Sequence, residues 1–352
     1  MTRASRIKER GLLKMIFVLL VIFLAAHFYS AKAQGIQANN FDPESRVSNT
    51  GKNIHVVSNL NKEARAVPLH ASINSPYAEL KPVLTPDGSR LYFSRSFHPD
   101  NTFGIADEED IWYSNFDKTS DTWSDAVRMT GLLNNAGPNY INNVSITGDT
   151  IILGNQYGKK ARMRAGVSYS VNVDGQWSAP VSIDILNDYN MSAHSNSFVS
   201  LKTGVIIRAI ERAETFGERD LYVSFWDGAH ATEAINMGSV INTPLEESSP
   251  FLAADNKTLY FASKGHAGFG GFDIFVTHRL DDSWTNWSAP ENLGPAVNGE
   301  LDDDFFSLSP CGKFATFSKQ VSVHNVDLFK ISIEDLFGQP ASQKGTPSFA
   351  SL

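Results

Sequence analysis

Short apolar runs separated by clusters of Gly, Asp, Asn and Pro recur along most of this chain. They are clearest in residues 249–298, which contain Pro250–Leu252, Leu259–Ala262, Asp273–Val276 and Trp287–Pro290. Runs bounded in this way are typical of short strands joined by tight turns in an antiparallel sheet. One sheet of four strands cannot bury both of its faces alone, so the pattern predicts further copies of the unit.

Two sequence markers repeat with one period. An Asp-Ile-aromatic step, degenerate at its second occurrence, recurs at Asp110, Gly166, Asp220, Asp273 and Asp327, at intervals of 53 to 56 residues. An apolar residue followed by Asn recurs as Asn74, Asn134, Asn187, Asn242 and Asn298. A fixed period of this length, with four strands in each unit, predicts a β-propeller, in which blades pack face to face around an axis.

The ends of the repeat region predict how the propeller closes. The last unit, residues 304–333, has three strand-like runs, whereas residues 69–74 form a fourth strand with no unit before them. We therefore expect an N-terminal strand near residues 66–73 to complete the last blade, which would remove an unpaired edge. The predicted fold is all-β: a five-bladed β-propeller of four-stranded antiparallel blades over residues 63–337, closed by the N-terminal strand.

The chain begins with the features of a secretory signal peptide. Basic residues precede an apolar run at residues 15–26, and Ala31-Lys32-Ala33 gives small residues in the pattern of a cleavage site. We expect residues 1–33 to be removed, with an uncleaved membrane anchor as the alternative. Residues 34–62 are expected to be a mobile lead-in and residues 338–352 a disordered tail, because both are polar and poor in aromatic residues. No stable membrane span is expected once the signal is removed.

Composition narrows the class of partner. Of the residues, 42% are hydrophobic and 19% charged, as in ordinary globular domains, and the formal net charge is −8. A negative protein of this kind is not expected to bind nucleic acid. The single cysteine, Cys311, cannot form an internal disulfide bond and stands in a Ser-Pro-Cys-Gly-Lys turn. It is interpreted as a turn residue.

The first repeat carries a family resemblance. Residues 84–94, LTPDGSRLYFS, are similar to the TolB-type, WD40-like propeller repeat of bacterial envelope proteins, and so are residues 268–275, GFGGFDIF. The resemblance covers about residues 66–333 and is weak in the second and third units. It implies a propeller that binds or scaffolds other molecules rather than one with a shared reaction.

The loops between second and third strands carry basic residues that would share one face of a propeller. These are Arg95, Arg208 with Arg212, Lys264 and Lys319, with His266 nearby, while the second unit has Lys159, Lys160, Arg162 and Arg164. Arg95, Arg212, Lys264, His266 and Lys319 are the predicted ligand-binding residues, for an anionic group, because converging charges concentrate an oppositely charged ligand. The alternative is a solvated rim, or pairing with neighbouring carboxylates.

The same face receives acidic residues at the starts of inner strands. Glu79, Glu247 and Asp303 begin successive inner strands, and two carboxylates about 5 to 10 Å apart are what a glycosidase requires. They are the alternative catalytic residues. The nine histidines show no zinc-binding spacing, and no nucleotide loop or serine-nucleophile motif is found. No metal or cofactor is expected.

The sequence thus favours an exported binding or scaffold protein, periplasmic or associated with the outer membrane. Its partner would be an envelope protein or an anionic glycan. The alternative is a glycoside hydrolase with carboxylates on the inner strands.

Overall fold

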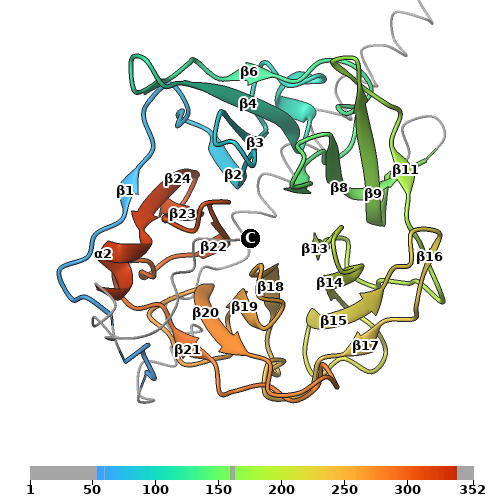
Figure 1. Ribbon diagram of the computed structural model, residues 1–352, viewed down its shortest axis with the longest axis vertical. Coiled ribbons are helices and arrows are strands. Elements are labelled where there is room, and N and C mark those ends of the chain that lie inside the picture. Colours follow the sequence, from blue (N-terminus) through green and yellow to red (C-terminus); the bar gives the residue numbers. More distant parts are fainter. Residues whose placement is uncertain (1–53, 59, 159–162, 339–352) are drawn as a thin grey trace, which may run out of the picture. The chain divides into compact units, whose positions relative to one another are not determined.

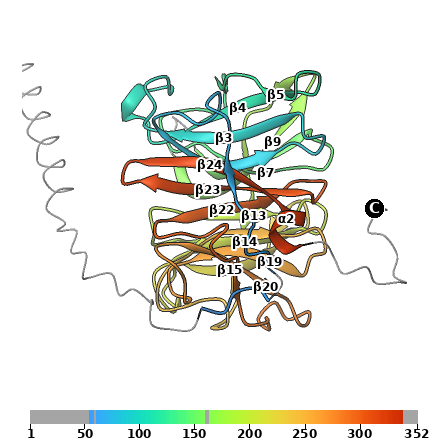
Figure 2. The same ribbon diagram turned by 90° about the vertical axis from the view of Figure 1, so that its left-hand side faces the viewer.

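The structure is a computed structural model that describes residues 54–58, 60–158 and 163–338. Five small antiparallel sheets are arranged around one axis as the blades of a propeller (Figure 1). Figure 2 shows the same blades from the side. The predicted five-bladed, all-β fold is therefore confirmed.

Each blade runs from an inner strand at the axis to short outer strands at the rim. Blade one has β2 (Ala78–Leu84), β3 (Arg90–Ser96), β4 (Asp110–Asp117), β5 (Thr122–Trp123) and β6 (Val127–Arg128), with the 3-10 helix η1 (Gly104–Ala106) between β3 and β4. Blade two has β7 (Ile141–Val144), β8 (Thr150–Tyr157), β9 (Met163–Val173), β10 (Gln176–Trp177) and β11 (Val181–Ser182). Blade three has β13 (Asn196–Val199), β14 (Val205–Ile210), β15 (Asp220–Phe225) and β17 (Ile235–Asn236).

The last two blades follow the same plan. Blade four has β18 (Glu247–Leu252), β19 (Thr258–Ser263), β20 (Asp273–His278) and β21 (Glu291–Asn292). Blade five has β22 (Asp303–Leu308), β23 (Phe314–Ser322), β24 (Asn325–Ser332) and, from the other end of the chain, β1 (Val67–Pro68). β1 pairs antiparallel with β24, with Val67 opposite Lys330. The predicted closure by the N-terminal strand is confirmed, and it gives β24 a partner along its outer edge.

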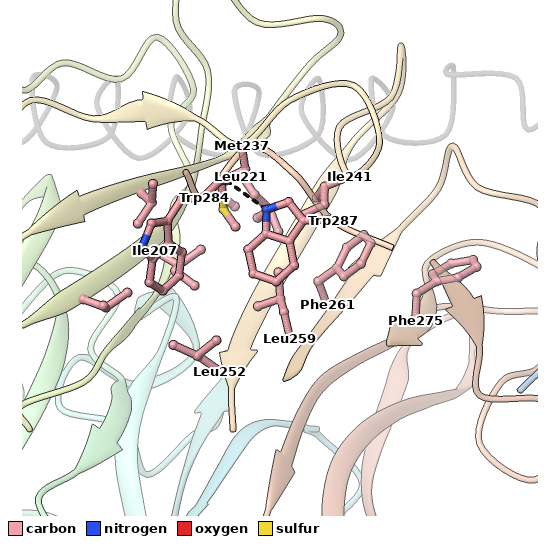
Figure 3. Close-up of a cluster of buried hydrophobic side chains, with 13 residues drawn as sticks. Ile207, Leu221, Met237, Ile241, Leu252, Leu259, Phe261, Phe275, Trp284 and Trp287 are labelled. Atoms are coloured by element: carbon pink, nitrogen blue, oxygen red, sulfur yellow. Dashed lines mark hydrogen bonds between the residues drawn. The ribbon is translucent and has the colours of Figure 1, made fainter. Parts of the chain in front are cut away.

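Hydrophobic side chains fill the layers between blades. Each of five clusters of buried residues lies between two neighbouring blades, the largest between blades three and four. Figure 3 shows this cluster, in which Ile207 and Leu221 of blade three face Leu259, Phe261 and Trp287 of blade four. Burying this apolar surface is what holds the blades together, because the blades share few backbone hydrogen bonds.

The two repeated sequence markers are bonded to each other. In blade four, the Asn298 side chain accepts from the Ile274 amide at 2.8 Å and donates to the Ile274 carbonyl at 2.9 Å. The same pair of hydrogen bonds joins Asn134 to Ile111, Asn242 to Leu221, and Asn74 to Leu328. The amide side chain thus substitutes for a strand partner at the start of each third strand, which satisfies buried backbone groups. In blade two, Asn187 is exposed, and its amide donates to Glu233 instead.

The described part of the lead-in is paired with the propeller. Val56 forms a parallel bridge with Asn292, and the Val57 amide donates to the Asn292 carbonyl at 3.1 Å. Val56 and Val57 belong to the segment 34–62 that we expected to be mobile. A short helix, α2 (Ile333–Phe337), follows β24 and buries Leu336 against the layer between blades four and five.

Two of the predicted segments lie outside the described residues: the signal peptide at 1–33, and the tail at 338–352 apart from Gly338. Within the part of the chain that the structure describes, no helix has both the length and the apolar character needed to cross a membrane.

Candidate functional site

One face of the propeller collects the longest connections. The segments between second and third strands, and those from each outer strand to the next inner strand, share this face, which we call the loop face. Three aromatic side chains in these segments are largely exposed: Phe97 is 55% exposed, Phe103 56% and Phe216 53%. Such rings offer apolar faces to a ligand that binds on this face.

The three predicted catalytic carboxylates are built into the loops of their own blades. Glu79, Glu247 and Asp303 are at most 1% exposed. Each accepts a hydrogen bond from the backbone amide four residues earlier, as in Thr243 to Glu247 at 2.8 Å. In blade two, Asn139 makes the same contact with the amide of Asn135. The shared geometry shows that these side chains fix the turn that leads into each inner strand.

Glu247 shows what this position does to a carboxyl group. It accepts from the hydroxyls of Thr243 and Ser263, both at 2.7 Å. Burial raises the pKa of Glu247 to about 7, although these hydrogen bonds lower it. None of the three carboxylates lines the axial cavity described below. Their catalytic role stays a prediction, and this geometry gives it no direct support.

The predicted basic residues of the loop face are all engaged by acceptors. Arg95 donates to Glu79 at 2.9 Å, Lys319 to Asp303 at 2.6 Å, and Lys264 to Glu246 at 2.8 Å. Arg212 lies 2.7 Å from Glu214, and His266 donates from Nε2 to the Ile241 carbonyl at 2.8 Å. These contacts match the alternative in which the basic residues pair with neighbouring carboxylates. Lys159, Lys160 and Arg162 lie outside the described residues.

These pairs differ in how far they remain accessible. The Arg95 and Arg212 side chains are 8% and 5% exposed, whereas Lys319 is 26% exposed and Lys264 39%. Burial lowers the pKa of His266, which therefore stays neutral near pH 7. Ligand binding by this set stays a prediction, and Lys264 is the member best placed to meet a ligand from solution.

A narrow cavity lies on the axis, where the five inner strands meet. Residues of β2, β7, β13, β18 and β22 line it, and its volume is about 40 Å³. Four of these strands bulge at this level, and three of the bulges place Lys81, Ser249 and Phe305 at positive φ angles of 56°, 37° and 57°. Bulges of this kind turn individual side chains toward a site.

Polar contacts join neighbouring blades around this cavity. Asn142 donates to Ser197 at 2.9 Å, Asn196 to Ser248 at 2.8 Å, and Ser307 to the Pro82 carbonyl at 3.0 Å. The Lys81 ammonium group lies 4.2 Å from the centre of the Tyr140 ring. Polar contacts between blades therefore surround the axis, beside apolar cavity residues such as Ile141, Phe198 and Phe306.

Asp304 is a carboxylate on β22, next in the chain to Phe305, which lines this cavity. It accepts from Ser248 at 3.2 Å, from the Ser249 hydroxyl, and from the Phe305 amide at 2.9 Å. Its neighbours Ser249 and Phe305 line the cavity, and its own side chain is partly exposed. Burial raises the pKa of Asp304 to about 6, while the hydrogen bond from Ser249 and the charge of Arg219 lower it.

Glu246 is a second carboxylate, one residue before β18. Arg219 donates to it from Nε at 2.6 Å, and Lys264 donates at 2.8 Å. Burial opposes ionisation of Glu246, but the charge of Arg219 and the contacts with Lys264 outweigh it, so the pKa of Glu246 is lowered. The Nη1 atom of Arg219 is buried and has no hydrogen-bond partner among the described residues.

The strand register relates Glu246 to Asp304. The Glu246 carbonyl accepts from the Lys264 amide at 3.0 Å, which continues the pairing of β18 with β19 by one residue. Glu246 and Ser248 therefore point to the same side of the strand, about 6.6 Å apart along it. Since Ser248 donates to Asp304, Glu246 and the partner of Asp304 lie on one side of this strand.

Sequence reasoning missed this pair, because it chose the acids that begin each inner strand. Glu246 and Asp304 are adjacent to two of those choices, Glu247 and Asp303. A shift of one residue moves a strand side chain to the other face. Arg219, which contacts one carboxylate and lowers the pKa of the other, carried no repeat signal that could have identified it. Among the described residues no cluster of three or more His, Cys, Asp or Glu could hold a metal ion.

Comparisons with solved structures agree on the fold. A structure described as "Glycoside hydrolase" covers 82% of this chain and 96% of its own, with 9% identity and a TM-score of 0.53. A structure described as a complex of BT0996 with RGII covers 82% and 95%, with 8% identity and a TM-score of 0.53. The alpha-L-arabinofuranosidase from Lactobacillus brevis covers 75% and 92%, with 12% identity and a TM-score of 0.49. At sequence identities this low, the structural likeness establishes the propeller fold alone.

Neither sequence comparison adds a family. No family model matches the chain. No curated protein matches it either. The resemblance to the TolB-type repeat is therefore confirmed only for the propeller that it implied.

The comparisons correct the expected function. The sequence favoured a binding or scaffold protein, with a glycoside hydrolase as the alternative. A solved structure that shares this fold is described as a glycoside hydrolase, which agrees with the alternative and not with the expected scaffold role.

Proposed function

We propose that this protein is a glycoside hydrolase whose site lies at the loop-face mouth of the axial cavity. The observation that carries the proposal is the placement of two carboxyl groups beside β18: Glu246 is paired with Arg219 and Lys264, and Asp304 accepts from Ser248 and Ser249. In these surroundings the pKa of Asp304 is raised to about 6, and that of Glu246 is lowered. Environments that separate two carboxyl pKa values in this way assign one group as the acid and the other as the base or nucleophile.

The chemistry assigns a role to each residue. Asp304, protonated below about pH 6, donates a proton to the leaving glycosidic oxygen. Glu246, held ionised by Arg219 and Lys264, acts on the opposite side of the sugar as the nucleophile or as the base that activates water. Arg219 positions Glu246 and is not itself a reacting group.

The size of the cavity fixes where the substrate lies. A volume of about 40 Å³ holds a few water molecules and not a sugar ring. The sugar therefore binds above the cavity, among the loops that carry Phe97, Phe103 and Phe216. Their exposed rings offer apolar faces on which sugar rings pack, as ligand sites commonly combine aromatic walls with a few polar groups.

The proposed substrate is a glycan with acidic sugars. Lys264 is 39% exposed and lies beside Glu246, so a carboxylate on the substrate would meet a cation at the mouth. An exported protein, cleaved after Ala33 and placed in the periplasm or at the outer membrane, would meet such polymers. The acidic substrate and the export of the protein are both part of the proposal. The relation to TolB-type envelope repeats is part of it too.

The test is a screen of acidic and neutral glycans for the release of reducing ends. We expect turnover on at least one glycan. Asp304→Asn and Glu246→Gln should each lower kcat by about 10² to 10⁴, the usual contribution of a general acid or base. Glu247→Gln is the matched control: it differs from Glu246→Gln by one position and should keep kcat within a few fold.

Folding is checked for each variant by circular dichroism and thermal melting. Two results would overturn the proposal: no turnover on any glycan by folded wild-type protein, or full activity in Asp304→Asn.

A further inference from the structure

A second concave site lies at the rim of the propeller, between blades two and three. We call it the rim groove, and its volume is about 560 Å³, within the range of small-molecule binding sites. It is lined by residues 184–187, 225–227 and 230–232. It lies near β16 (His230–Ala231), at the outer edge in Figure 1.

The groove exists because blade three lacks a tryptophan that other blades carry. Trp123-Ser124, Trp177-Ser178 and Trp287-Ser288 share one repeat position, where the serine hydroxyl accepts from a backbone amide of the third strand. In blade three, Thr232 makes that contact with the Phe225 amide at 3.0 Å, so Ala231 stands where the indole would be.

The missing indole lets part of blade two cross over blade three. The strand β12 (Asp184–Ile185) pairs parallel with β16, and Ile185 lies opposite Ala231. The Leu186 amide continues the pairing to the Ala231 carbonyl at 3.0 Å. A tryptophan at position 231 would occupy the space that β12 fills. The groove therefore depends on having Ala231 at this position.

The lining of the groove combines aromatic, apolar and hydrogen-bonding groups. Trp226 is half-buried, and its ring is held by Tyr169, with 5.7 Å between ring centres, whereas the Phe225 ring packs on Trp284 between blades three and four. The indole Nε1 of Trp226 has no hydrogen-bond partner among the described residues, although buried indole groups usually find one. His230 and Asp184 form an exposed pair at 3.1 Å.

We propose that the rim groove binds a neutral oligosaccharide. The Trp226 ring and Leu186 suit the apolar faces of sugar rings, and Asp184, His230 and Asn187 suit their hydroxyl groups. The groove residues include Asp184 and Asp227 and no Lys or Arg, so an acidic chain would be repelled. This inference rests on the proposed action on glycans, and it adds a binding site remote from the carboxylates at the axis.

The experiment is a titration of the full chain with neutral oligosaccharides, such as fragments of xylan, mannan and β-glucan, and with a uronate oligomer. Binding is followed by the indole N–H signal of Trp226 in an NMR spectrum, assigned with Trp226→Phe. We expect this signal to shift with at least one neutral oligosaccharide and not with the uronate oligomer. No shift with any of them, or a preference for the uronate oligomer, would overturn the proposal.

The chain offers a matched pair of variants. Leu186 in the groove and Leu280 in blade four are both 61% exposed, and blade four keeps its Trp287. Leu186→Arg and Asp184→Ala should weaken binding at least tenfold, whereas Leu280→Arg should not. Equal affinity in Leu186→Arg and Leu280→Arg would place the ligand elsewhere and refute the assignment.

The test of the rim groove can fail independently of the test of the proposed hydrolase. Asp304→Asn should leave the titration unchanged, and Leu186→Arg should leave the cleavage of a small aryl glycoside unchanged. If no glycan is cleaved, the titration still decides whether the groove binds neutral sugar.

Discussion

At the scale of single residues, Ser249 controls the acidity of the proposed proton donor. Its hydroxyl donates to Asp304 and lowers the pKa of that carboxyl, against the larger effect of burial. Because Asp304 must be protonated to act as an acid, kcat/KM should fall as the pH rises through about 6. Because Glu246 must be ionised, kcat/KM should also fall as the pH drops below the lowered pKa of Glu246.

Replacing Ser249 should move one side of this profile. Without its hydroxyl the pKa of Asp304 rises, so the alkaline limb of kcat/KM should shift to higher pH in Ser249→Ala. Ser307→Ala is the control, since Ser307 lines the same cavity but donates to the Pro82 carbonyl. An unshifted limb in Ser249→Ala would show that Asp304 is not the group being titrated.

Glu247 gives a residue-scale prediction about stability. Its pKa is raised from 4.5 to about 7, so between these values the folded state binds more protons than the unfolded state. The free energy of unfolding contributed by Glu247 is therefore greatest below pH 4.5 and decreases as the pH rises to 7. In Glu247→Gln this decrease should be smaller, by up to about 1.4 kcal/mol per pH unit.

Urea unfolding at several values between pH 4.5 and 7 would measure both slopes, provided that the linear dependence on urea is kept. Parallel slopes for wild type and Glu247→Gln would show that Glu247 is ionised in the folded state throughout this range.

The residue scale is where sequence analysis had least power. It found acids at the right ends of the right strands, yet Glu246 and Glu247 differ only in the face to which they point. Strand register decides to which face of the strand each of these two side chains points, and register depends on contacts with neighbouring strands. The pairing of Glu246 with Arg219, 27 residues earlier in the chain, has no signature in a single sequence.

At the scale of elements, the Asn and Asp-Ile markers were visible in sequence because one structural unit requires both. The Asn298 side chain bonds both backbone groups of Ile274, and only an amide can accept and donate at once in this geometry. The two markers that predicted five blades therefore belong to one structural feature, in which the Asn side chain bonds the start of the third strand. Blade two departs from it, as its weak sequence match suggested, and Asn187 lies exposed there.

This cap predicts the cost of removing it. Asn298→Ala would leave the buried amide and carbonyl of Ile274 without partners and should lower the free energy of unfolding by about 2 to 4 kcal/mol. Asn187→Gly is the control, because Asn187 has a φ of 52° that glycine adopts without strain, and it should cost less than about 0.5 kcal/mol. Equal losses in urea unfolding would contradict the capping role.

At the scale of the whole molecule, the closure was predictable because the sequence contained an orphan strand at one end and an incomplete blade at the other. The partner of Val56, which is Asn292, had no signal in the sequence, since residues 34–62 carry no repeat. The rim groove was equally hidden, because it depends on one absent tryptophan and on a strand from the neighbouring blade.

The ring closure should be the point at which the propeller opens first when it is weakened. Asn74 joins the two ends of the chain: its side chain bonds the amide and carbonyl of Leu328 and also the Leu69 carbonyl at 3.0 Å. Asn74→Ala and Asn298→Ala remove equivalent caps, but only the first lies where β1 and β24 meet. Because β1 pairs through only two residues, its release needs few broken bonds.

We therefore expect hydrogen exchange in β24 to become faster in Asn74→Ala, with blades two to four little changed. In Asn298→Ala, faster exchange should instead centre on β20. Exchange measured by mass spectrometry on peptides of each blade would separate the two patterns. Uniform acceleration over all five blades in Asn74→Ala would mean that the propeller opens as one unit, and that the junction of its ends is no weaker than any other junction.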